Sequence, residues 1–402
     1  MNAMKVPDSA IGQGGRIFIF GFLAAITPLS IDIYLPALPT LRAALAADEA
    51  QTLYTLSAFF IGFGAGQLLF GPLTDRFGRK SPLLCGLAVY IVASVGCALA
   101  TTMTAIVAWR FAQALGGSIV PIAVQAMVRD LYARDESARI LSLNLLVIAS
   151  APVLAPLIGG QVLLWLDWRF IFWVLVGFGA LALVAASVLP ETLAAERRSS
   201  AHPLALLLGY AALLRNGRYL GYVACSTSYF CCLFAFLAGS PFLYIEYFGV
   251  PPQFYGFLFG VNMLGMIAAT FVNSRIVMRR GADPLLRRAC MIGAAAGVVL
   301  LATGVSGFAG LPGIAVPLFV VLSLLTVVSS NAVSGALAAA PSAGAAAALA
   351  GALQFGAGAL MSALTGWIAD GTPRPMSAII CAAALAALAA NLLLLPRAGA
   401  AR

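Results

Sequence analysis

Long apolar stretches alternate with short polar connections along the 402 residues of the chain. A helix needs about 20 predominantly apolar residues to cross a bilayer. Twelve stretches fit this length and are punctuated by glycine, proline and charged residues. They cover residues 17–38, 51–71, 82–101, 105–127, 141–164, 170–189, 219–245, 254–274, 288–307, 314–336, 345–368 and 376–395. The pattern predicts an all-α membrane protein.

The composition agrees with a chain embedded in a lipid bilayer. Hydrophobic residues make up 62% of the sequence and charged residues 9%, whereas about 25% of a soluble domain is charged. Residues 1–16 are polar and the first apolar stretch is too long for a cleaved signal peptide, so no cleavage is expected.

Basic residues predict the orientation in the membrane. Lys and Arg outside the apolar stretches fall in connections on one side, except for Arg42, Arg169 and Arg374. Because basic connections stay in the cytoplasm, both termini are expected there. The net charge of +9 follows from this placement, so it does not indicate a nucleic-acid partner.

The longest polar connection, residues 191–218, separates six apolar stretches from six. It predicts an N-terminal bundle over 1–190, a cytoplasmic linker over 191–218 and a C-terminal bundle over 219–402. Basic segments follow the second stretch of each half, at 71–80 and at 273–281. Internal repeats with a binding site at their interface are typical of secondary transporters.

Asp32 is the only carboxylate well inside an apolar stretch. A charge at this depth costs roughly 2.5–3.5 kcal/mol, so intramembrane ionisable groups usually have a function. Arg110 is the only arginine well inside a stretch, and both residues are expected about 9 Å below the outer boundary. This equal depth permits an ion pair that takes up and releases a proton. The alternative is a static buried pair that only fixes packing.

The segment Gly71–Lys80 is a short basic loop containing one acid, Asp75. Its glycines Gly71 and Gly78 permit tight turns, and Asp75 is placed to cap a helix N-terminus. An ordinary cytoplasmic loop would explain Arg76 and Arg79, but not the acid or the glycines.

A run of small residues marks the fifth stretch. Ala151, Ala155 and Gly159 recur every four residues, which lets a neighbouring helix approach closely. Pro152 and Pro156 each remove a helix hydrogen bond and are expected to bend the helix. Generic close packing is the alternative.

The sequence lacks the motifs of several other chemistries. It has no Gly-x-x-x-x-Gly-Lys-Ser/Thr segment for ATP, no Ser/His/Asp set and no metal-ligand cluster. We therefore expect a protein without enzymatic activity, cofactor or metal.

Three of these segments resemble the major facilitator superfamily. Residues 71–80 are similar to its signature between the second and third helices. Arg110, Gln113 and Gly116 are similar to its fourth-helix signature, and 151–160 to the fifth-helix signature of its drug antiporters. Within the superfamily, the chain resembles the bicyclomycin/chloramphenicol resistance (Bcr/CflA) branch. The segments that carry this resemblance are 32–39, 66–79, 167–172, 190–193 and 240–248.

The resemblance implies a major facilitator fold of twelve transmembrane helices in two six-helix bundles. It implies a proton-coupled efflux antiporter in the bacterial inner membrane that exports small amphiphilic drugs such as chloramphenicol, florfenicol or bicyclomycin by alternating access. Asp32 would bind the proton and touch the substrate, with Arg110 as its coupled partner. Asp75 would dock on the start of the eleventh helix when the outer side is closed. The first helix has no second acid, which favours neutral or zwitterionic drugs.

The same resemblance nominates residues for two tasks. The candidates for substrate contact are Asp32, Tyr34, Tyr54, Asn144, Tyr229, Phe234, Asn262, Asn331 and Gln354, with ordinary helix packing as the alternative. The candidates for conformational gating are Gly71, Asp75, Arg76, Gly78, Arg79, Pro152, Pro156 and Gly159. A monomer is expected. Two other functions stay open: an exporter of a small metabolite such as the amino acid cysteine, and a membrane receptor without transport.

Overall fold

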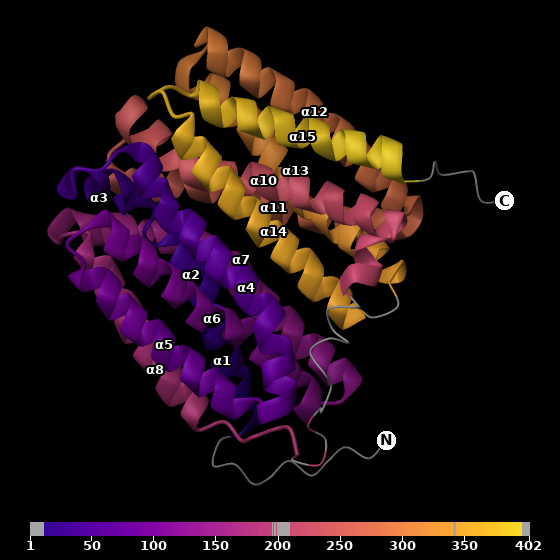
Figure 1. Ribbon diagram of the computed structural model, residues 1–402. Helices are drawn as coiled ribbons and strands as arrows, with labels where there is room; N and C mark the ends of the chain where they lie inside the picture. Colours follow the sequence, from indigo (N-terminus) through magenta and orange to yellow (C-terminus); the bar gives the residue numbers. More distant parts are fainter. Residues whose placement is uncertain (1–11, 195, 197, 199–209, 341–342, 396–402) are drawn as a thin grey trace.

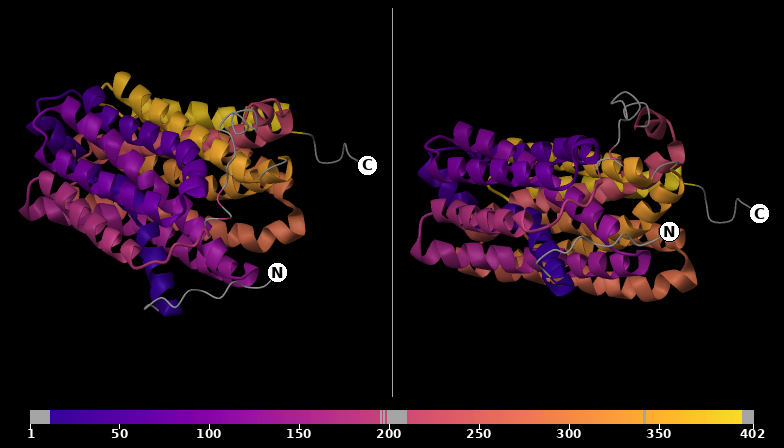
Figure 2. Two further views of the ribbon diagram at one scale, coloured as in Figure 1. Left: turned by 60° about the horizontal axis from the view of Figure 1, so that its bottom comes forward. Right: turned by 90° about the horizontal axis from the view of Figure 1, so that it is seen from below.

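The computed structural model describes residues 12–194, 196, 198, 210–340 and 343–395, which form helices and no strand (Figure 1). Twelve of the helical segments are long and apolar enough to cross a membrane. The first six spans pack together in the lower part of Figure 1 and the last six in the upper part, and Figure 2 shows the two groups from two further directions. This arrangement confirms the predicted major facilitator fold.

Ten of the spans are single helices and two are built from several segments. The first span contains α1 (Gln13–Ala24), α2 (Ile26–Asp32), η1 (Leu35–Ala37) and α3 (Leu38–Ala44), and the seventh contains α10 (Gly217–Pro241) and η3 (Phe242–Tyr247). The others are α4 (Glu49–Phe77), α5 (Lys80–Leu99), α6 (Met103–Leu131), α7 (Arg134–Trp165), α8 (Arg169–Ser187), α11 (Pro252–Arg280), α12 (Ala282–Ser306), α13 (Gly310–Ala338), α14 (Ala343–Trp367) and α15 (Arg374–Leu394).

Prolines break the first span. A proline lacks the N–H that continues a helix ladder, and Pro28, Pro36 and Pro39 lie in or beside the short segments. As a result α2 ends at Asp32 and a 3₁₀ turn follows. The seventh span changes from an α-helix to a π-helix directly after Pro241.

Several helices continue past their apolar stretches. The predicted loop at 71–80 is mostly helix, because α4 extends to Phe77. A helix satisfies its own backbone groups and can therefore continue into a polar border. The turn is confined to Gly78, whose φ of 92° favours glycine. The tight turn predicted at Gly71 is wrong.

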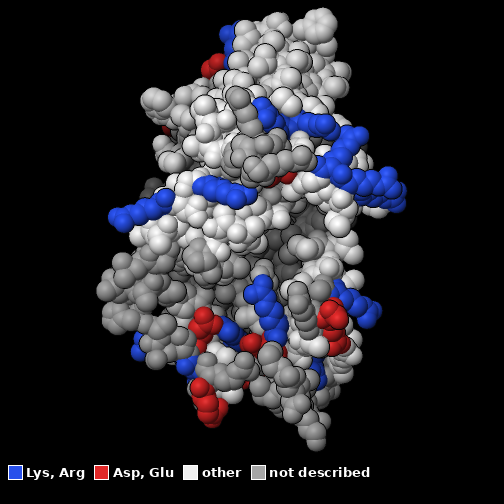
Figure 3. All heavy atoms as spheres, turned by 90° about the vertical axis from the view of Figure 1, so that its right-hand side faces the viewer, with Lys and Arg blue, Asp and Glu red and all other residues white. Residues whose placement is uncertain are grey.

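The two halves meet at the end of the molecule that carries the α3–α4 and α14–α15 connections, here named the closed end. There the Ser362 hydroxyl donates to the Leu53 carbonyl at 3.2 Å, and a Cβ on Gly366 would lie 2.7 Å from the Cα of Ala50. The opposite end, here named the basic end, carries many Lys and Arg side chains and is hollowed between the halves (Figure 3).

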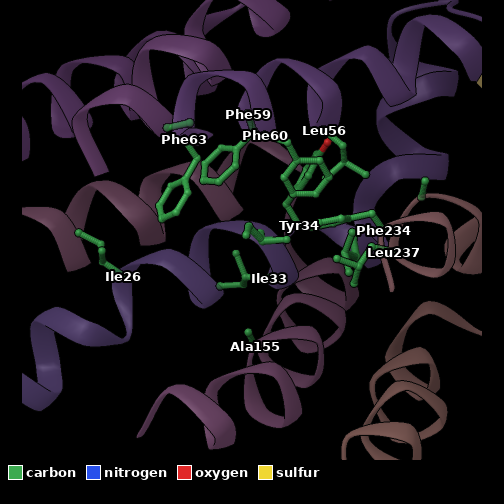
Figure 4. Packing of buried hydrophobic residues seen from close by; sticks show 14 of the residues in the cluster. Ile26, Ile33, Tyr34, Leu56, Phe59, Phe60, Phe63, Ala155, Phe234 and Leu237 are labelled. Carbon is green, nitrogen blue, oxygen red and sulfur yellow. The ribbon is translucent and has the colours of Figure 1, made fainter. Parts of the chain in front are cut away.

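Aromatic side chains fill the space between the halves. The rings of Phe60 from α4 and Phe234 from α10 have centroids 4.4 Å apart. Phe63 from α4 and Phe355 from α14 are 4.5 Å apart. Figure 4 shows Phe59, Phe60 and Phe63 along one helix, with Tyr34 and Phe234 nearby. This packing lies in the same core cluster as the break in the first span.

Candidate transport site

Asp32 is buried at the break in the first span. Its exposed fraction is 4%, and no basic nitrogen in the described ranges lies within 4.0 Å of its carboxylate. An ionised carboxylate that is buried without a partner is strongly disfavoured, and such a group neutralises instead. The environment therefore suits a protonated carboxyl.

Arg110 is fully buried in α6. Its Nη1 donates to the Ser30 carbonyl at 3.0 Å and to Gln113 Oε1 at 2.7 Å. The guanidinium lies over the rings of Tyr34, at 4.5 Å, and Phe59, at 4.3 Å. The two other guanidinium nitrogens, Nε and Nη2, have no hydrogen-bond partner within the described part of the chain.

Asp32 and Arg110 do not form, in the described part of this structure, the ion pair that their equal depth permits. The first span presents the carbonyl of Ser30 and the ring of Tyr34 to the guanidinium instead. α2 ends at Asp32, and Ile33 and Tyr34 lie in the turn before η1, so this break fixes which side chains face α6. Equal depth in the membrane did not determine the direction of the carboxylate.

A chain of hydrogen bonds holds Arg110 in place. Gln113 donates to the Ser94 hydroxyl at 2.7 Å, and Ser94 donates to the Tyr90 carbonyl at 2.7 Å. The Tyr90 hydroxyl lies 2.7 Å from the Ser30 hydroxyl and closes the chain onto α2. The sequence analysis did not predict a role for Tyr90 and Ser94. Their spacing of four residues, which places two polar side chains on one face of an apolar helix, could have indicated it.

The fourth-helix signature also includes Gly116, at the contact between α5 and α6. A Cβ at this position would lie 2.5 Å from the carbonyl oxygen of Gly86 and 2.7 Å from the backbone nitrogen of Tyr90. Only glycine therefore permits this approach, which brings Ser94 within reach of Gln113.

Some of the nominated substrate contacts lie between the halves or carry unpartnered polar atoms. Tyr34 bonds to the Thr55 hydroxyl, and Phe234 belongs to the aromatic packing described above. Asn144 on α7 is 4% exposed, and neither of its side-chain polar atoms has a partner among the described residues. Asn262 on α11 keeps an unpartnered Oδ1. Unpartnered buried polar atoms are uncommon and can mark a place for a ligand or an ion.

Other nominated residues lie elsewhere. Tyr54 is 42% exposed and does not belong to the core. Tyr229 donates to the Ala289 carbonyl at 3.1 Å, inside the C-terminal half. In that half Asn331 donates to Asn273 Oδ1 at 3.0 Å, and Gln354 donates to the Ser226 hydroxyl at 2.9 Å. The structure thus does not bring Tyr54 or Tyr229 to the interface between the halves.

Arg79 anchors a charged cluster at the basic end. It pairs with Asp75 and, through Nε at 3.3 Å, with Asp130. Glu191 accepts the backbone N–H groups of Arg79 at 2.8 Å and Lys80 at 3.1 Å. Glu191, rather than Asp75, therefore caps the start of α5. Burial opposes ionisation of Glu191, but its four backbone hydrogen bonds outweigh burial and hold the pKa below the ordinary value.

The predicted docking of Asp75 involves the start of the eleventh helix, where residues 341–342 lie outside the described ranges, so it stays a prediction. The halves are in contact at the closed end, yet Asp75 pairs with Arg79 in its own half. Asp75 lies near the basic end, where the two halves are separated by a hollow. Docking of Asp75 on the C-terminal half therefore requires the basic end to close. The Arg76 guanidinium lies over the ring of its neighbour Phe77, 5.5 Å from the ring centroid.

The small-residue face of α7 packs against the first span. Ala155 is fully buried, and a Cβ on Gly159 would lie 1.9 Å from the Ile33 carbonyl oxygen. Pro152 and Pro156 lie inside this helix. The next residue, Gly160, faces the other half, where a Cβ would lie 2.7 Å from the Pro252 oxygen. α7 is therefore in close contact with both η1 and α11.

Comparisons with known proteins agree with this architecture. Residues 20–362 match the model of the Major Facilitator Superfamily. The bicyclomycin resistance protein homolog of Haemophilus influenzae is 33% identical over 91% of this chain and 93% of its own length. The chloramphenicol resistance protein of Pseudomonas aeruginosa is 34% identical over 78% of this chain and 74% of its own.

Solved structures share the fold at low identity. A partially occluded inward-open structure of the E. coli xylose transporter XylE is 15% identical, with a TM-score of 0.71, and covers 93% of this chain and 96% of its own. The peptide transporter POT in complex with sulfate has a TM-score of 0.76 at 15% identity and covers 94% of this chain and 93% of its own. The chain is a multi-pass bacterial membrane protein and belongs to the major facilitator superfamily, a family of transporters rather than enzymes, in the branch of the bicyclomycin and chloramphenicol resistance proteins.

Proposed function

We propose that this protein is a proton-coupled efflux antiporter that exports small amphiphilic drugs by alternating access. The names of its bacterial relatives support drugs of the bicyclomycin and chloramphenicol type. We include florfenicol among the proposed substrates as a further drug of the same class. The basic end faces the cytoplasm by the positive-inside rule, so both termini are cytoplasmic and the hollow opens inward. The protein works as a monomer.

The observation that carries the proposal is Asp32, a carboxyl buried near the interface of the halves with no basic partner among the residues that the structure describes. Its charge state sets the cost of burying it, so gain or loss of one proton changes the relative stability of the two conformations. Inward movement of one charge supplies about 2.3 kcal/mol per 100 mV of membrane potential. This free energy would drive the uphill export of a neutral drug.

Neutral substrates fit the surroundings of Asp32. The space between the halves is lined by aromatic rings, and Asn144 and Asn262 offer unpartnered amide atoms. Arg110 is 0% exposed and stacked between two rings, so it does not present its charge to a substrate. A mostly apolar cavity with a few neutral polar groups is typical of sites for uncharged drugs.

The test measures drug-driven proton movement in proteoliposomes that carry an inward proton gradient and a pH-sensitive dye. Chloramphenicol, florfenicol, bicyclomycin and cysteine are supplied separately. We expect proton movement with the first three and none with Asp32→Asn. Tyr54→Phe is the matched control, because Tyr54 lies on an exposed face.

Two outcomes would contradict the proposal. Uphill, protonophore-sensitive transport by Asp32→Asn would show that Asp32 is not the proton carrier. Proton movement with cysteine alone would make the protein a metabolite exporter, and no proton-dependent flux with any compound would favour a receptor.

A further inference from the structure

The junction of α11 and α12 at the basic end, here named the arginine corner, contains one acid and five basic residues. The basic residues are Arg275, Arg279, Arg280, Arg287 and Arg288. None of them forms an ion pair with a described residue. The acid, Asp283, accepts a hydrogen bond from the Tyr222 hydroxyl of α10 at 2.8 Å. Figure 3 shows Lys and Arg side chains gathered on the upper part of this end, which belongs to the C-terminal half.

The corresponding corner of the N-terminal half, between α4 and α5, contains its own anions. Gly78 there and Gly281 in the arginine corner make turns of the same kind, with φ of 92° and 77°. After Gly78, Glu191 accepts the backbone N–H groups of Arg79 and Lys80, and Arg79 pairs with two further carboxylates. After Gly281, α12 begins without a side-chain cap. The arginine corner therefore lacks, among the described residues, the carboxylates that its N-terminal counterpart contains.

Two of the five arginines lie where an exposed apolar helix face ends. The Arg275 guanidinium lies over the ring of Phe271, 4.2 Å from the ring centroid, and Phe271 is exposed. On α12, the exposed side chains of Met291 and Ile292 follow Arg288 by three and four residues. Residues at this spacing share a helix face. Each helix thus presents apolar side chains to the lipid tails and an arginine at the polar border of the same face.

These two arginines lie at the same depth. Gly281 alone joins the helices, and Arg275 precedes it by six residues while Arg288 follows it by seven. At 1.5 Å per residue, both are about 10 Å from the turn along the helix axes. α11 and α12 contact each other, and Arg279 and Arg280 lie between this pair and the turn. Cytoplasmic retention explains basic residues in a connection, but it does not explain a pair at equal depth beside exposed apolar faces.

We propose that the arginine corner binds the phosphate of an anionic phospholipid through Arg275 and Arg288, with the acyl chains along the exposed apolar faces. A guanidinium forms paired, charge-assisted hydrogen bonds with phosphate oxygens, and basic sites between helices at the membrane border suit anionic head groups. A free phosphate would use the charges but not the apolar faces. The inference goes beyond the proposed function, because it requires only that the chain is embedded in a bilayer.

The experiment measures lipid binding to the full-length protein in a nonionic detergent at physiological salt. Phosphatidylglycerol and phosphatidylcholine are titrated separately and bound lipid is counted by native mass spectrometry. The thermal unfolding temperature is measured with each lipid and with inorganic phosphate. A ligand that binds only the folded protein raises this temperature. We expect phosphatidylglycerol to bind and to raise it, and phosphatidylcholine and inorganic phosphate to do neither.

The variant Arg275→Gln with Arg288→Gln removes both phosphate contacts. Each basic residue at an anionic lipid contributes about fivefold in affinity, so this variant should bind phosphatidylglycerol about 30-fold more weakly. Arg275→Lys with Arg288→Lys keeps the charges and should retain most of the binding. The matched control is Arg129→Gln with Arg139→Gln, which removes two exposed arginines of the N-terminal half and should bind the lipid as the wild type does. The unfolding temperature without lipid shows whether each variant is folded.

Several outcomes would overturn the inference. Wild-type affinity in the double glutamine variant of the arginine corner would exclude it as the site. An equal loss in the Arg129 and Arg139 control would indicate general attraction by positive charge. If phosphatidylcholine binds as tightly as phosphatidylglycerol, or inorganic phosphate raises the unfolding temperature as much, the ligand is not an anionic lipid. None of these results bears on proton-coupled export, which the flux measurement tests separately.

Discussion

Gly159 offers the most direct test of the packing between α7 and the first span. Alanine at this position would place its Cβ 1.9 Å from the Ile33 carbonyl oxygen and 3.1 Å from Pro36 Cγ. The near atom belongs to the backbone, so no side-chain rotation relieves the overlap. The two segments must separate by about 1.5 Å to restore ordinary contact.

Overpacking of this kind costs about 1–3 kcal/mol. This cost falls on the conformation in which α7, η1 and α11 are pressed together, so Gly159→Ala should reduce the closed-to-open ratio roughly 5- to 150-fold. Drug-driven proton movement should fall with it. The measurements are the spin-label distance at the closed end and the thermal unfolding temperature in detergent.

Gly177→Ala is the matched control. Gly177 is also helical, but a Cβ there meets no atom within 4 Å. Alanine in place of an interior helical glycine stabilises by about 0.5–1 kcal/mol, so this variant should unfold at the same or a slightly higher temperature. A Gly159→Ala protein with the wild-type closed fraction and unfolding temperature would refute the packing argument.

Three further predictions concern charged side chains. Arg42 donates to Glu246 at 3.0 Å across the two halves, and both side chains are partly exposed. Arg42→Gln should therefore weaken closure by only about 0.2–1 kcal/mol. A larger loss in a spin-label measurement of the closed end, or no rescue when the two charges are exchanged, would contradict a simple ion pair. Arg110→Lys should lower transport roughly tenfold, because an ammonium group cannot both bond to Ser30 and Gln113 and stack between the two rings as the guanidinium does. A proteoliposome flux equal to that of the wild type would show that the guanidinium geometry is unimportant. The folded pKa of Glu191 is lowered from its ordinary value of 4.5, so its stabilising contribution is present above about pH 4.5 and is lost as pH falls through the lowered pKa. Glu191→Gln should therefore lower the unfolding temperature at pH 7 and remove part of its acid dependence, and an unchanged melting profile between pH 7 and 3 would contradict this role.

The apolar pattern predicted the number of spans and the class of fold, because the bilayer imposes length and hydrophobicity on every crossing helix. The ends of the helices were less predictable. Gly71–Phe77 is polar and glycine-containing, yet it continues α4, since nothing at the membrane border forces a helix to stop. Only the positive φ of Gly78 marks the real end.

The site was partly predictable. Burial of Asp32 and Arg110 followed from their positions inside apolar stretches, and both are below 5% exposed. Their pairing did not follow, because the breaks in the first span fix which residues face α6. The contact between η1 and α11 depends on tertiary packing between halves that are distant in sequence, and no local pattern encodes it.

The π-helical turn Phe242–Tyr247 follows α10 at the closed end. A π-turn bonds each residue to the fifth along, one more than an α-helix does. Reversion of this turn to an α-helix would rotate the residues after it by about 100° about the helix axis. Such a twist would move Glu246 away from Arg42 without tilting α10. A change of helix type within this one turn would then break the Arg42–Glu246 ion pair between the halves.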